Sequence, residues 1–334
     1  MPITTMELAP QRRLLLFAGR AHMPLAEAIA AHLGVELADP GITDFASGEL
    51  RCRLGENVRG ADVFIIQTHA QSESMTVNDS IMEQLVMIDA AKRASAKRIT
   101  AVMPYYGYAR QDRKSKGREP ITARLIADLF LAAGADRLMS IDLHSGQIQG
   151  FFDGPVDHLT AMPVLLAHLQ TLAGTDFVIV APDTGRTKVA EQAGRNLGVD
   201  VASVYKRRDK DKANEVEALG VMGEEAIQGR LCILIDDMID TAGTICAAAE
   251  VLLDKGARDV WAMCTHPVLS GAAVDRLKAS RISRVVVTDT LPIGSEKQFD
   301  KLEIVSVATI VADTIAAVFE DRSVSEIFGG QNQS

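Results

Sequence analysis

The sequence contains no apolar run of the roughly 18 to 20 residues that a membrane-spanning helix requires. Its first apolar run, Leu14 to Ala18, is too short for the apolar part of a secretion signal and is typical of a first β-strand. The four cysteines, Cys52, Cys232, Cys246 and Cys264, stand far apart and form no CxxC pair. This spacing argues against a disulfide framework and against a zinc ribbon. We therefore expect a cytoplasmic protein without a membrane partner.

The chain also lacks an excess of positive charge, since 35 Lys and Arg residues face 44 Asp and Glu residues and the net charge is −9. This balance disfavours a nucleic-acid-binding surface over the whole protein, although a local basic patch is compatible with it. Hydrophobic residues make up 47% and charged residues 24%, as in ordinary globular proteins, which excludes wholesale disorder. The length of 334 residues predicts about two domains.

Short apolar runs alternate with amphipathic segments along almost the whole chain. The predicted strands are residues 14–19, 62–68, 98–106, 137–144, 177–183, 199–206, 231–237, 259–266 and 284–290. Such continuous runs are typical of strands that are buried on both faces of a parallel sheet. The segments between them, such as MPLAEAIAAHL and TICAAAEVLLDKG, have helical periodicity, and several end at glycine. Repeated βαβ units of this kind predict an α/β protein.

Each half of the chain contains a predicted strand that ends in acidic residues, Asp142 in the first and Asp236 and Asp237 in the second. This doubling predicts two tandem doubly wound domains with mainly parallel sheets. The turn-rich segment FFDGPVD, residues 151–157, separates the halves. We expect domains at residues 1–155 and 156–310, and a C-terminal helix and tail at 311–334 that pack back on the first domain. One large mixed sheet is the alternative.

Residues 231–256 carry the strongest functional signal. An apolar strand leads to Asp236 and Asp237 at its carboxyl end, where open α/β sheets bind ligands. A loop of small residues then leads directly into a helix: Asp240, Thr241, Ala242, Gly243 and Thr244. Backbone N–H groups and the helix dipole favour a phosphate at such a place. Because two carboxylates would repel that phosphate, a vicinal diol such as that of ribose is their natural partner; a capped helix without a ligand is the alternative.

The segment DDMIDTAGT, residues 236–244, resembles the ribose-5-phosphate signature of phosphoribosyltransferases and ribose-phosphate pyrophosphokinases. Residues 101–130 resemble the ATP-binding flexible loop of the second family, and residues 140–161 resemble its metal-site region. From these motifs the chain is identified as a member of the ribose-phosphate pyrophosphokinase family, phosphate-dependent class. The resemblance implies type I phosphoribosyltransferase-like domains. It also implies conversion of ATP and D-ribose 5-phosphate into 5-phospho-α-D-ribose 1-diphosphate and AMP, for nucleotide biosynthesis.

The loop at residues 105–120 carries five basic residues and two acidic ones in an otherwise acidic protein. Such a local cationic segment can attract a polyphosphate. Its tyrosines leave stacking on single-stranded RNA open, and a solvated loop is the simplest alternative. The resemblance implies that Arg110 and Gln111 bind ATP, and that nucleic acid is not a partner.

Four further residues receive a role. His144 and Asp183 follow predicted strands whose ends can converge, and imidazole plus carboxylate suits Mg²⁺ or Mn²⁺ once ATP oxygens complete the shell. The family places its metal ligands at these positions, with Asp142 nearby through water; a hydrogen-bonded histidine is the alternative. Lys206 and Arg208 would point to one side of an extended segment, although a solvated face is the alternative. The resemblance implies that Lys206 is catalytic and that Arg208 contacts ribose 5-phosphate.

The segment FASGE, residues 45–49, resembles the hairpin that supplies the adenine pocket from a neighbouring subunit. Phe45 would stack on the base and Glu49 would accept from its amino group. Between them lie Ser47, at a position where many members have Asp, and Gly48. The resemblance therefore implies a homo-oligomer, a hexamer built from dimers, whose active sites are shared between subunits.

The sequence departs from the family pattern after Asp183, where many members continue with two glycines and an Arg-Ala-Arg run. Here Gly185 is followed by Arg186, and Glu191 stands where a second Arg is usual. Because the metal ligand and Gly185 are retained, we expect activity. Two other functions stay open: a phosphoribosyltransferase, which would consume the product, and a non-catalytic regulatory homologue, which would be expected to lose Lys206, His144 or the basic loop.

Overall fold

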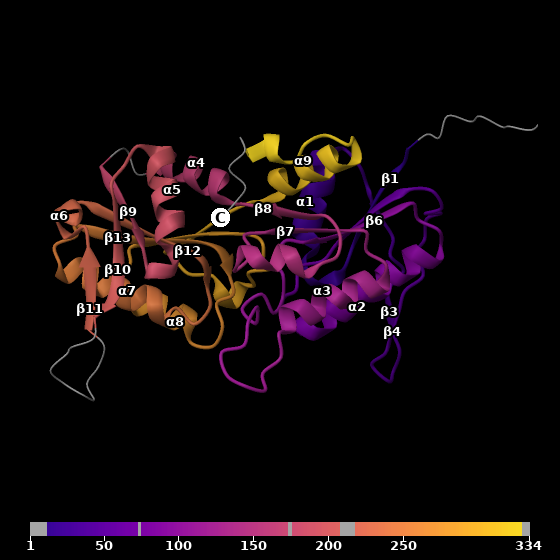
Figure 1. Cartoon of the computed structure of the whole chain (residues 1–334), viewed down its shortest axis with the longest axis horizontal. Coiled ribbons are helices and arrows are strands. Elements are labelled where there is room, and N and C mark those ends of the chain that lie inside the picture. The colour runs from indigo at the N-terminus through magenta and orange to yellow at the C-terminus, as the bar shows by residue number, and fades with distance from the viewer. Residues whose placement is uncertain (1–11, 73–74, 173–175, 208–217, 329–334) are drawn as a thin grey trace, which may run out of the picture.

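The computed structural model describes residues 12–72, 75–172, 176–207 and 218–328. Two mainly parallel sheets lie next to each other along the long axis of the molecule, with helices on both of their faces (Figure 1). The first half of the chain forms one sheet and the second half forms the other. The predicted α/β class with two mainly parallel sheets is confirmed, and the alternative of a single large mixed sheet is wrong.

The first sheet has the strand order β2-β1-β5-β6-β7-β8, and every neighbouring pair is parallel. Its strands are β1 (Leu14–Ala18), β2 (Leu37–Ala38), β5 (Asp62–Ile66), β6 (Arg98–Met103), β7 (Arg137–Ile141) and β8 (Val156–Leu159). The central strand β5 is buried along its whole length, as its continuous apolar run predicted.

The second sheet has the strand order β11-β10-β9-β12-β13-β14-β15 and is parallel except for the pair β10 and β11. Its strands are β9 (Phe177–Ala181), β10 (Val201–Arg207), β11 (Ala218–Met222), β12 (Leu231–Ile239), β13 (Asp259–Pro267), β14 (Arg284–Thr288) and β15 (Leu302–Val305). Strand β12 lies in the middle of this sheet, between β9 and β13. The carboxyl end of β12 is therefore surrounded by the ends of its parallel neighbours.

Helices cover both sheets, and a short antiparallel hairpin of β3 (Thr43–Asp44) and β4 (Leu50–Arg51) extends from the first half. The helices of the first half are α1 (Met23–Leu33), α2 (Val77–Arg93) and α3 (Thr122–Ala133). Those of the second half are α4 (Met162–Leu172), α5 (Thr187–Leu197), α6 (Glu224–Ile227), α7 (Gly243–Asp254), α8 (Ala273–Ala279) and α9 (Ala308–Phe319). Short 3₁₀ turns include η2 (Gly146–Phe151) and η3 (Thr184–Arg186).

One apolar cluster runs through both halves of the molecule. It includes Leu16 of β1, Ile29 of α1, Ile233 of β12 and Met263 of β13, each at most 1% exposed. The C-terminal helix α9 belongs to this cluster through Ile315 and packs against α1 in the first half (Figure 1). The two sheets are thus held in a common core, and their adjoining ends are fixed relative to each other.

The structure differs from the expected domain limits in one respect. Strand β8 pairs with β7 and completes the first sheet, so this sheet continues past the expected boundary at residue 155. The sequence did not predict β8 as a strand because two of its four residues are polar. Asp157 of β8 accepts two hydrogen bonds of 2.8 and 2.9 Å from Arg137 of β7, which allows this carboxylate to lie in a largely buried strand.

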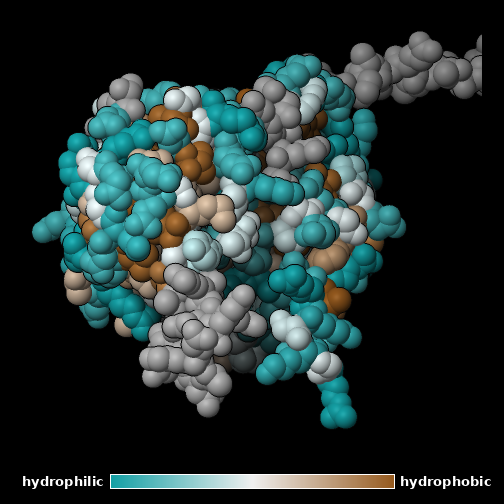
Figure 2. All heavy atoms as spheres, turned by 60° about the vertical axis from the view of Figure 1, so that its left-hand side comes forward, coloured by the Kyte–Doolittle hydropathy of each residue, from teal (hydrophilic) through white to brown (hydrophobic). Residues whose placement is uncertain are grey.

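None of the described helices combines the length and the apolar composition that crossing a membrane would require. On the face drawn in Figure 2, hydrophilic side chains prevail, and the apolar ones form separate small patches between them.

The common core predicts a large cost for truncating α9. We expect Ile315→Ala, at a fully buried position, to lower the free energy of unfolding by about 2 to 5 kcal/mol, because it removes apolar contacts and leaves a cavity. Thr309→Ala, at an exposed position of the same helix, should change it by no more than about 0.5 kcal/mol. Urea unfolding of both variants measures the difference; equal values would show that α9 is not part of the core.

Candidate active site

Two adjacent carboxylates lie near the end of β12. Five buried apolar residues precede them, and β12 continues to Ile239 rather than ending at the acids. Asp236 accepts a hydrogen bond of 2.8 Å at Oδ1 from the backbone N–H of Asp237. Asp237 is largely buried. Since like charges repel at this distance and burial removes water, the pair requires positive or hydrogen-bonding partners.

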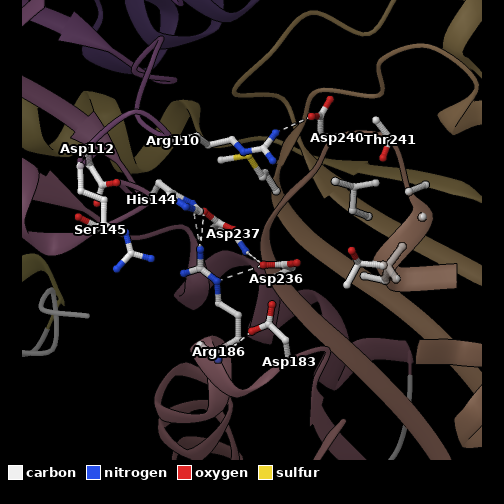
Figure 3. A pocket seen from close by; sticks show the side chains of 18 of the residues that line it. Arg110, Asp112, His144, Ser145, Asp183, Arg186, Asp236, Asp237, Asp240 and Thr241 are labelled. Carbon is white, nitrogen blue, oxygen red and sulfur yellow. Dashed lines mark hydrogen bonds and ion pairs between the residues drawn. The ribbon is translucent and has the colours of Figure 1, made fainter. Parts of the chain in front are cut away.

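Two side chains from other elements meet this acidic pair (Figure 3). The Arg186 guanidinium lies 3.1 Å from Asp236 through Nε and 2.6 Å from Asp237 through Nη2. His144, which follows β7 of the first sheet, lies 2.7 Å from Asp237 Oδ2 through Nδ1. The pair is thus contacted from both halves of the molecule.

The two carboxyl groups titrate differently in this environment. Burial raises the pKa of Asp236, and the hydrogen bond and charge of Asp237 raise it further. Burial acts in the same direction on Asp237, but the hydrogen bond of His144 and the charge of Arg186 outweigh it and lower the pKa of Asp237. As the pH falls, Asp236 is therefore the first of the two to accept a proton, and Asp237 keeps its charge to lower pH.

The loop from Asp240 to Thr244 forms the entrance to helix α7. Ala242 adopts the left-handed conformation with φ 62°, which is uncommon for a residue with a side chain and concentrates at functional sites. The loop is fixed from α8 and the turn before it. The Arg276 guanidinium donates to the backbone carbonyl of Thr241 at 2.7 Å, and Ser270 donates to the Asp240 carboxylate. Thr241, Gly243 and Thr244 remain exposed at the helix N-terminus, where an anion is favoured.

Arg110 connects the basic loop of the first half to this entrance. Its Nη1 lies 2.5 Å from Asp240 Oδ2 (Figure 3). The base of the basic loop is anchored by buried His69, which accepts from the backbone N–H of Gly107 at Nδ1 (2.9 Å) and lies 3.0 Å from Gln84 through Nε2. Burial lowers the pKa of His69 to about 4, so this ring is neutral at pH 7 and can accept from Gly107.

These groups surround a cavity of about 510 Å³ between the two halves. Predicted site residues that line it are Arg110, His144, Asp183, Asp236, Asp237, Asp240, Thr241, Ala242, Gly243 and Thr244. The cavity combines an acidic pair, a helix N-terminus and an arginine from a separate loop. Such a set can hold a diol, a phosphate and a second anionic group at the same time.

The predicted metal ligands can be tested against their surroundings. Asp183 follows β9 and is exposed, and its Oδ1 accepts from the backbone N–H of Gly185 at 2.8 Å. Within the described ranges, Asp183 Oδ2 and His144 Nε2 take part in no hydrogen bond. Among the same residues, no group of three or more His, Cys, Asp and Glu side chains could hold a metal ion. The pair of His144 and Asp183 suits a hard cation that takes most of its ligands from water and phosphate, as Mg²⁺ commonly does.

The side chain of Asp142 hydrogen-bonds to residues outside the expected metal site. Its Oδ2 accepts hydrogen bonds from Thr265 Oγ1 at 2.6 Å and from the backbone N–H of Ala161 at 3.0 Å. It does not line the 510 Å³ cavity. The Asp142 carboxylate therefore connects the end of β7 to α4 and β13, a structural role that its position after a strand did not reveal.

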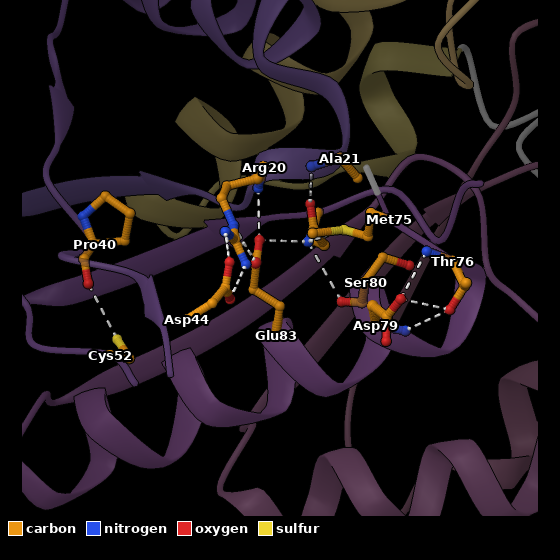
Figure 4. Close-up of polar contacts among 11 residues, drawn as sticks. Arg20, Ala21, Pro40, Asp44, Cys52, Met75, Thr76, Asp79, Ser80 and Glu83 are labelled. Atoms are coloured by element: carbon orange, nitrogen blue, oxygen red, sulfur yellow. Dashed lines mark hydrogen bonds and ion pairs between the residues drawn. The ribbon is translucent and has the colours of Figure 1, made fainter. Parts of the chain in front are cut away.

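The hairpin residues Phe45, Ser47, Gly48 and Glu49 do not line the cavity of their own chain. The base of the hairpin is fixed by Arg20, whose guanidinium lies within 2.7 Å of Asp44 and of Glu83 (Figure 4). Phe45 is 53% exposed, and Ser47 donates to Glu49 at 3.0 Å. The hairpin is thus a fixed projection with an exposed aromatic ring.

The remaining predicted residues lie elsewhere or outside the description. Gln111 lines a neighbouring space together with Arg110, and its side chain accepts from Thr122 at 2.6 Å. Lys206 is in β10, opposite Leu219 of β11, but its side chain is outside the described part. Arg208 lies outside the described residues.

Sequence reasoning missed the contacts of three residues. Ser270 and Arg276 hydrogen-bond to the loop from Asp240 to Thr244 although they lie some 30 residues further along the chain. No local sequence pattern around them indicates this contact. Arg186 was noticeable only as a departure from a family pattern, and its ion pairs with the acids could not be predicted.

Fold and site together define an α/β protein with two mainly parallel sheets and, between them, a cavity lined by an acidic pair, a helix N-terminus and an arginine. Residues 14–134 match the family described as the N-terminal domain of ribose phosphate pyrophosphokinase, and residues 203–329 match the phosphoribosyl synthetase-associated domain. The chain belongs to the ribose-phosphate pyrophosphokinase family.

Individual relatives agree over almost the full length. The chain is 50% identical to a ribose-phosphate pyrophosphokinase of Streptomyces coelicolor, over 98% of this chain and 100% of the relative. It is 51% identical to that of Bifidobacterium longum, over 97% of this chain and 94% of the relative. The crystal structure of phosphoribosylpyrophosphate synthetase from Mycobacterium smegmatis superposes with a TM-score of 0.85 at 48% identity, covering 93% of this chain and 100% of that one.

Proposed function

We propose that the protein transfers the β,γ-diphosphoryl group of ATP to the anomeric hydroxyl of D-ribose 5-phosphate. The products are 5-phospho-α-D-ribose 1-diphosphate and AMP. The observation that carries this proposal is the single cavity in which the acidic pair, the small-residue loop and Arg110 lie together. Each of these matches one part of the substrates: the ribose diol, the 5-phosphate and the phosphates of ATP. Family membership supports the same reaction and does not favour a phosphoribosyltransferase or a non-catalytic homologue.

The ribose side of the reaction follows from the chemistry of β12 and α7. The oxygens of Asp236 and Asp237 would accept hydrogen bonds from the 2- and 3-hydroxyls. The exposed N–H groups and hydroxyls from Thr241 to Thr244 would hold the 5-phosphate at the positive end of the helix dipole. This arrangement fixes both ends of the sugar and leaves the anomeric hydroxyl free to attack. Arg208 would contribute a further contact to ribose 5-phosphate.

On the nucleotide side, the chain's cations orient ATP and neutralise charge that develops on the transferred group. Arg110 and Gln111 would contact ATP from the basic loop, and Lys206 would stabilise the diphosphoryl group during transfer. Phosphoryl-type transfers depend mainly on in-line positioning and charge neutralisation, so no covalent nucleophile is required. His144 and Asp183 would hold Mg²⁺, or alternatively Mn²⁺. The bound ion would supply further charge neutralisation on the phosphate oxygens.

The direct test incubates purified protein with ATP, ribose 5-phosphate and magnesium, and measures AMP and 5-phospho-α-D-ribose 1-diphosphate. Equal amounts of the two products support the proposal. Exchange of pyrophosphate with a nucleobase instead would identify a phosphoribosyltransferase, and no reaction with an intact fold would indicate a regulatory homologue. We also propose a cytoplasmic location, which the free state of all four cysteines supports.

Lys206 provides the first variant. If its ammonium meets charge that grows only in the transition state, Lys206→Ala should lower kcat by about a hundredfold to a thousandfold and change KM little. Steady-state kinetics measures both constants. Lys255→Ala serves as the control, since Lys255 is exposed and its side chain pairs with Glu224 at the surface. A Lys206 variant with half of the wild-type kcat would remove this residue from the mechanism.

The proposed metal site predicts a change in magnesium dependence. His144→Ala and Asp183→Asn should each raise the magnesium concentration that gives half-maximal activity, because water and phosphate alone hold the ion less well. Titration of magnesium at fixed ATP measures this concentration. His32→Ala is the matched control, since this exposed histidine pairs with Asp313 far from the cavity. Unchanged titration curves in both site variants would place the metal elsewhere.

We propose further that the active protein is a homo-oligomer, a hexamer built from dimers, in which Phe45 and Glu49 complete the ATP pocket of a neighbouring chain. The exposed position of this hairpin, outside the cavity of its own chain, supports this arrangement. Symmetric assemblies build shared sites readily, because the same interface recurs in every copy.

The shared site predicts complementation. The double variant Phe45→Ala, Glu49→Ala and the single variant Lys206→Ala should each be nearly inactive alone. When they are mixed and reassembled, part of the activity should return, since some interfaces then combine an intact hairpin with an intact catalytic half. AMP formation measures the recovery. No recovery, with subunit exchange shown by mass spectrometry, would mean that one chain builds its own adenine pocket.

A further inference from the structure

Arg186 occupies the acidic pair on which ribose binding is proposed to depend. It lies at the end of η3, immediately before α5, and its side chain reaches from there to the end of β12 (Figure 3). Its Nε and Nη2 contact Asp236 and Asp237 at 3.1 and 2.6 Å, and Nη2 lies 3.3 Å from His144 Nδ1. The side chain is only 17% exposed. One planar guanidinium thus bridges two carboxylates, which is a geometry that arginine provides and lysine does not.

These contacts occupy one oxygen atom of each carboxylate, Oδ1 of Asp236 and Oδ2 of Asp237. Asp237 Oδ2 already accepts from Arg186 and from His144, and Asp236 Oδ1 accepts from Arg186 and from the backbone N–H of Asp237. All three side chains, Arg186, Asp236 and Asp237, line the 510 Å³ cavity. A ribose that hydrogen-bonds to these two oxygen atoms from the cavity competes with the guanidinium.

We propose that Arg186 is a clamp on the acidic pair, that ribose 5-phosphate displaces it on binding, and that it thereby sets the affinity for this substrate. The proposal rests on the function proposed above. Without ligand, the guanidinium balances two adjacent carboxylates whose side chains are 18% and 6% exposed, so the clamped state is favourable. Binding of the sugar must then offset the loss of these charge-assisted hydrogen bonds.

The surroundings of Arg186 give the displaced side chain room. A second cavity of about 760 Å³ is also lined by Arg186, Asp236 and Asp237. Arg186 thus lines both cavities, and rotation of its side chain can move the guanidinium from the first cavity into the second. A glycine at position 186 would have no side chain to form the clamp, so Arg186→Gly removes it completely.

The test measures binding of ribose 5-phosphate by isothermal titration calorimetry, with EDTA and without ATP, so that no cation competes for the carboxylates. For Arg186→Gly we expect the Kd to fall by about tenfold to a hundredfold, the range that one charge-assisted hydrogen bond corresponds to. Arg186→Gln should bind as tightly as the Gly variant. Arg186→Lys keeps the positive charge but loses the planar guanidinium, so its Kd should lie between those of these variants and that of the wild type.

The matched control is Arg93→Gln, which removes an exposed arginine of α2 that pairs with Asp89 at 2.6 Å and lines neither cavity. Its Kd should equal that of the wild type. Thermal melting separates clamping from a purely structural role: the Gly and Gln variants should melt lower than the wild type without ligand and gain more from ribose 5-phosphate. A loss of stability without tighter binding, or weaker binding in these variants, would overturn the proposal.

Wild-type controls separate this proposal from the proposed function. A wild type that neither binds ribose 5-phosphate nor forms AMP contradicts both. If the wild type does both and none of the folded Arg186 variants binds more tightly, the clamp alone is wrong.

Discussion

The structure depends on one electrostatic constraint, the placement of Asp236 and Asp237 side by side near the end of a central buried strand. Two carboxylates removed from water in this way cannot remain without partners. The partners come from separate parts of the chain: Arg186 from the start of α5 and His144 from the end of the first sheet. These contacts to the acidic pair therefore require that the two halves keep their relative positions. The apolar cluster shared by β1, α1, β12 and α9 fixes these relative positions.

Parallel topology explains why groups so distant in sequence meet at this pair. His144, Asp183 and the Asp240 loop each follow the carboxyl end of a parallel strand, β7, β9 and β12 respectively. In an open α/β sheet these ends share one edge, and here two sheets bring such edges together across one cavity. Arg110 then joins the halves a second time through Asp240. Ala242 at the α7 entrance adopts the left-handed conformation, which disfavours β-branched and bulky residues at this position.

Local sequence patterns predicted the buried strands and the strand-end acids well, because continuous apolar runs and the loops after them report burial directly. The same reasoning missed β8 and β15, since their alternation of polar and apolar residues is weak over four positions and their burial depends on a neighbouring strand. It also could not assign Asp142, whose hydrogen bond to Thr265 joins positions 123 residues apart. Contacts between distant segments, such as that of Arg186 with the acids, follow from the packing of whole elements rather than from any local pattern.

The hairpin of β3 and β4 is held in place by side-chain ion pairs at its base. Arg20 holds Asp44 at its base through two hydrogen bonds of 2.7 and 2.9 Å, and the same guanidinium reaches Glu83 of α2 (Figure 4). The chain thereby positions the base of the hairpin before any partner is bound, while Phe45 remains 53% exposed at its tip. Ordering a loose loop on association would cost conformational entropy, and a preformed projection avoids much of that cost. A hairpin that is fixed at its base and carries an exposed aromatic ring supports the proposal that this segment completes the ATP pocket of a neighbouring chain.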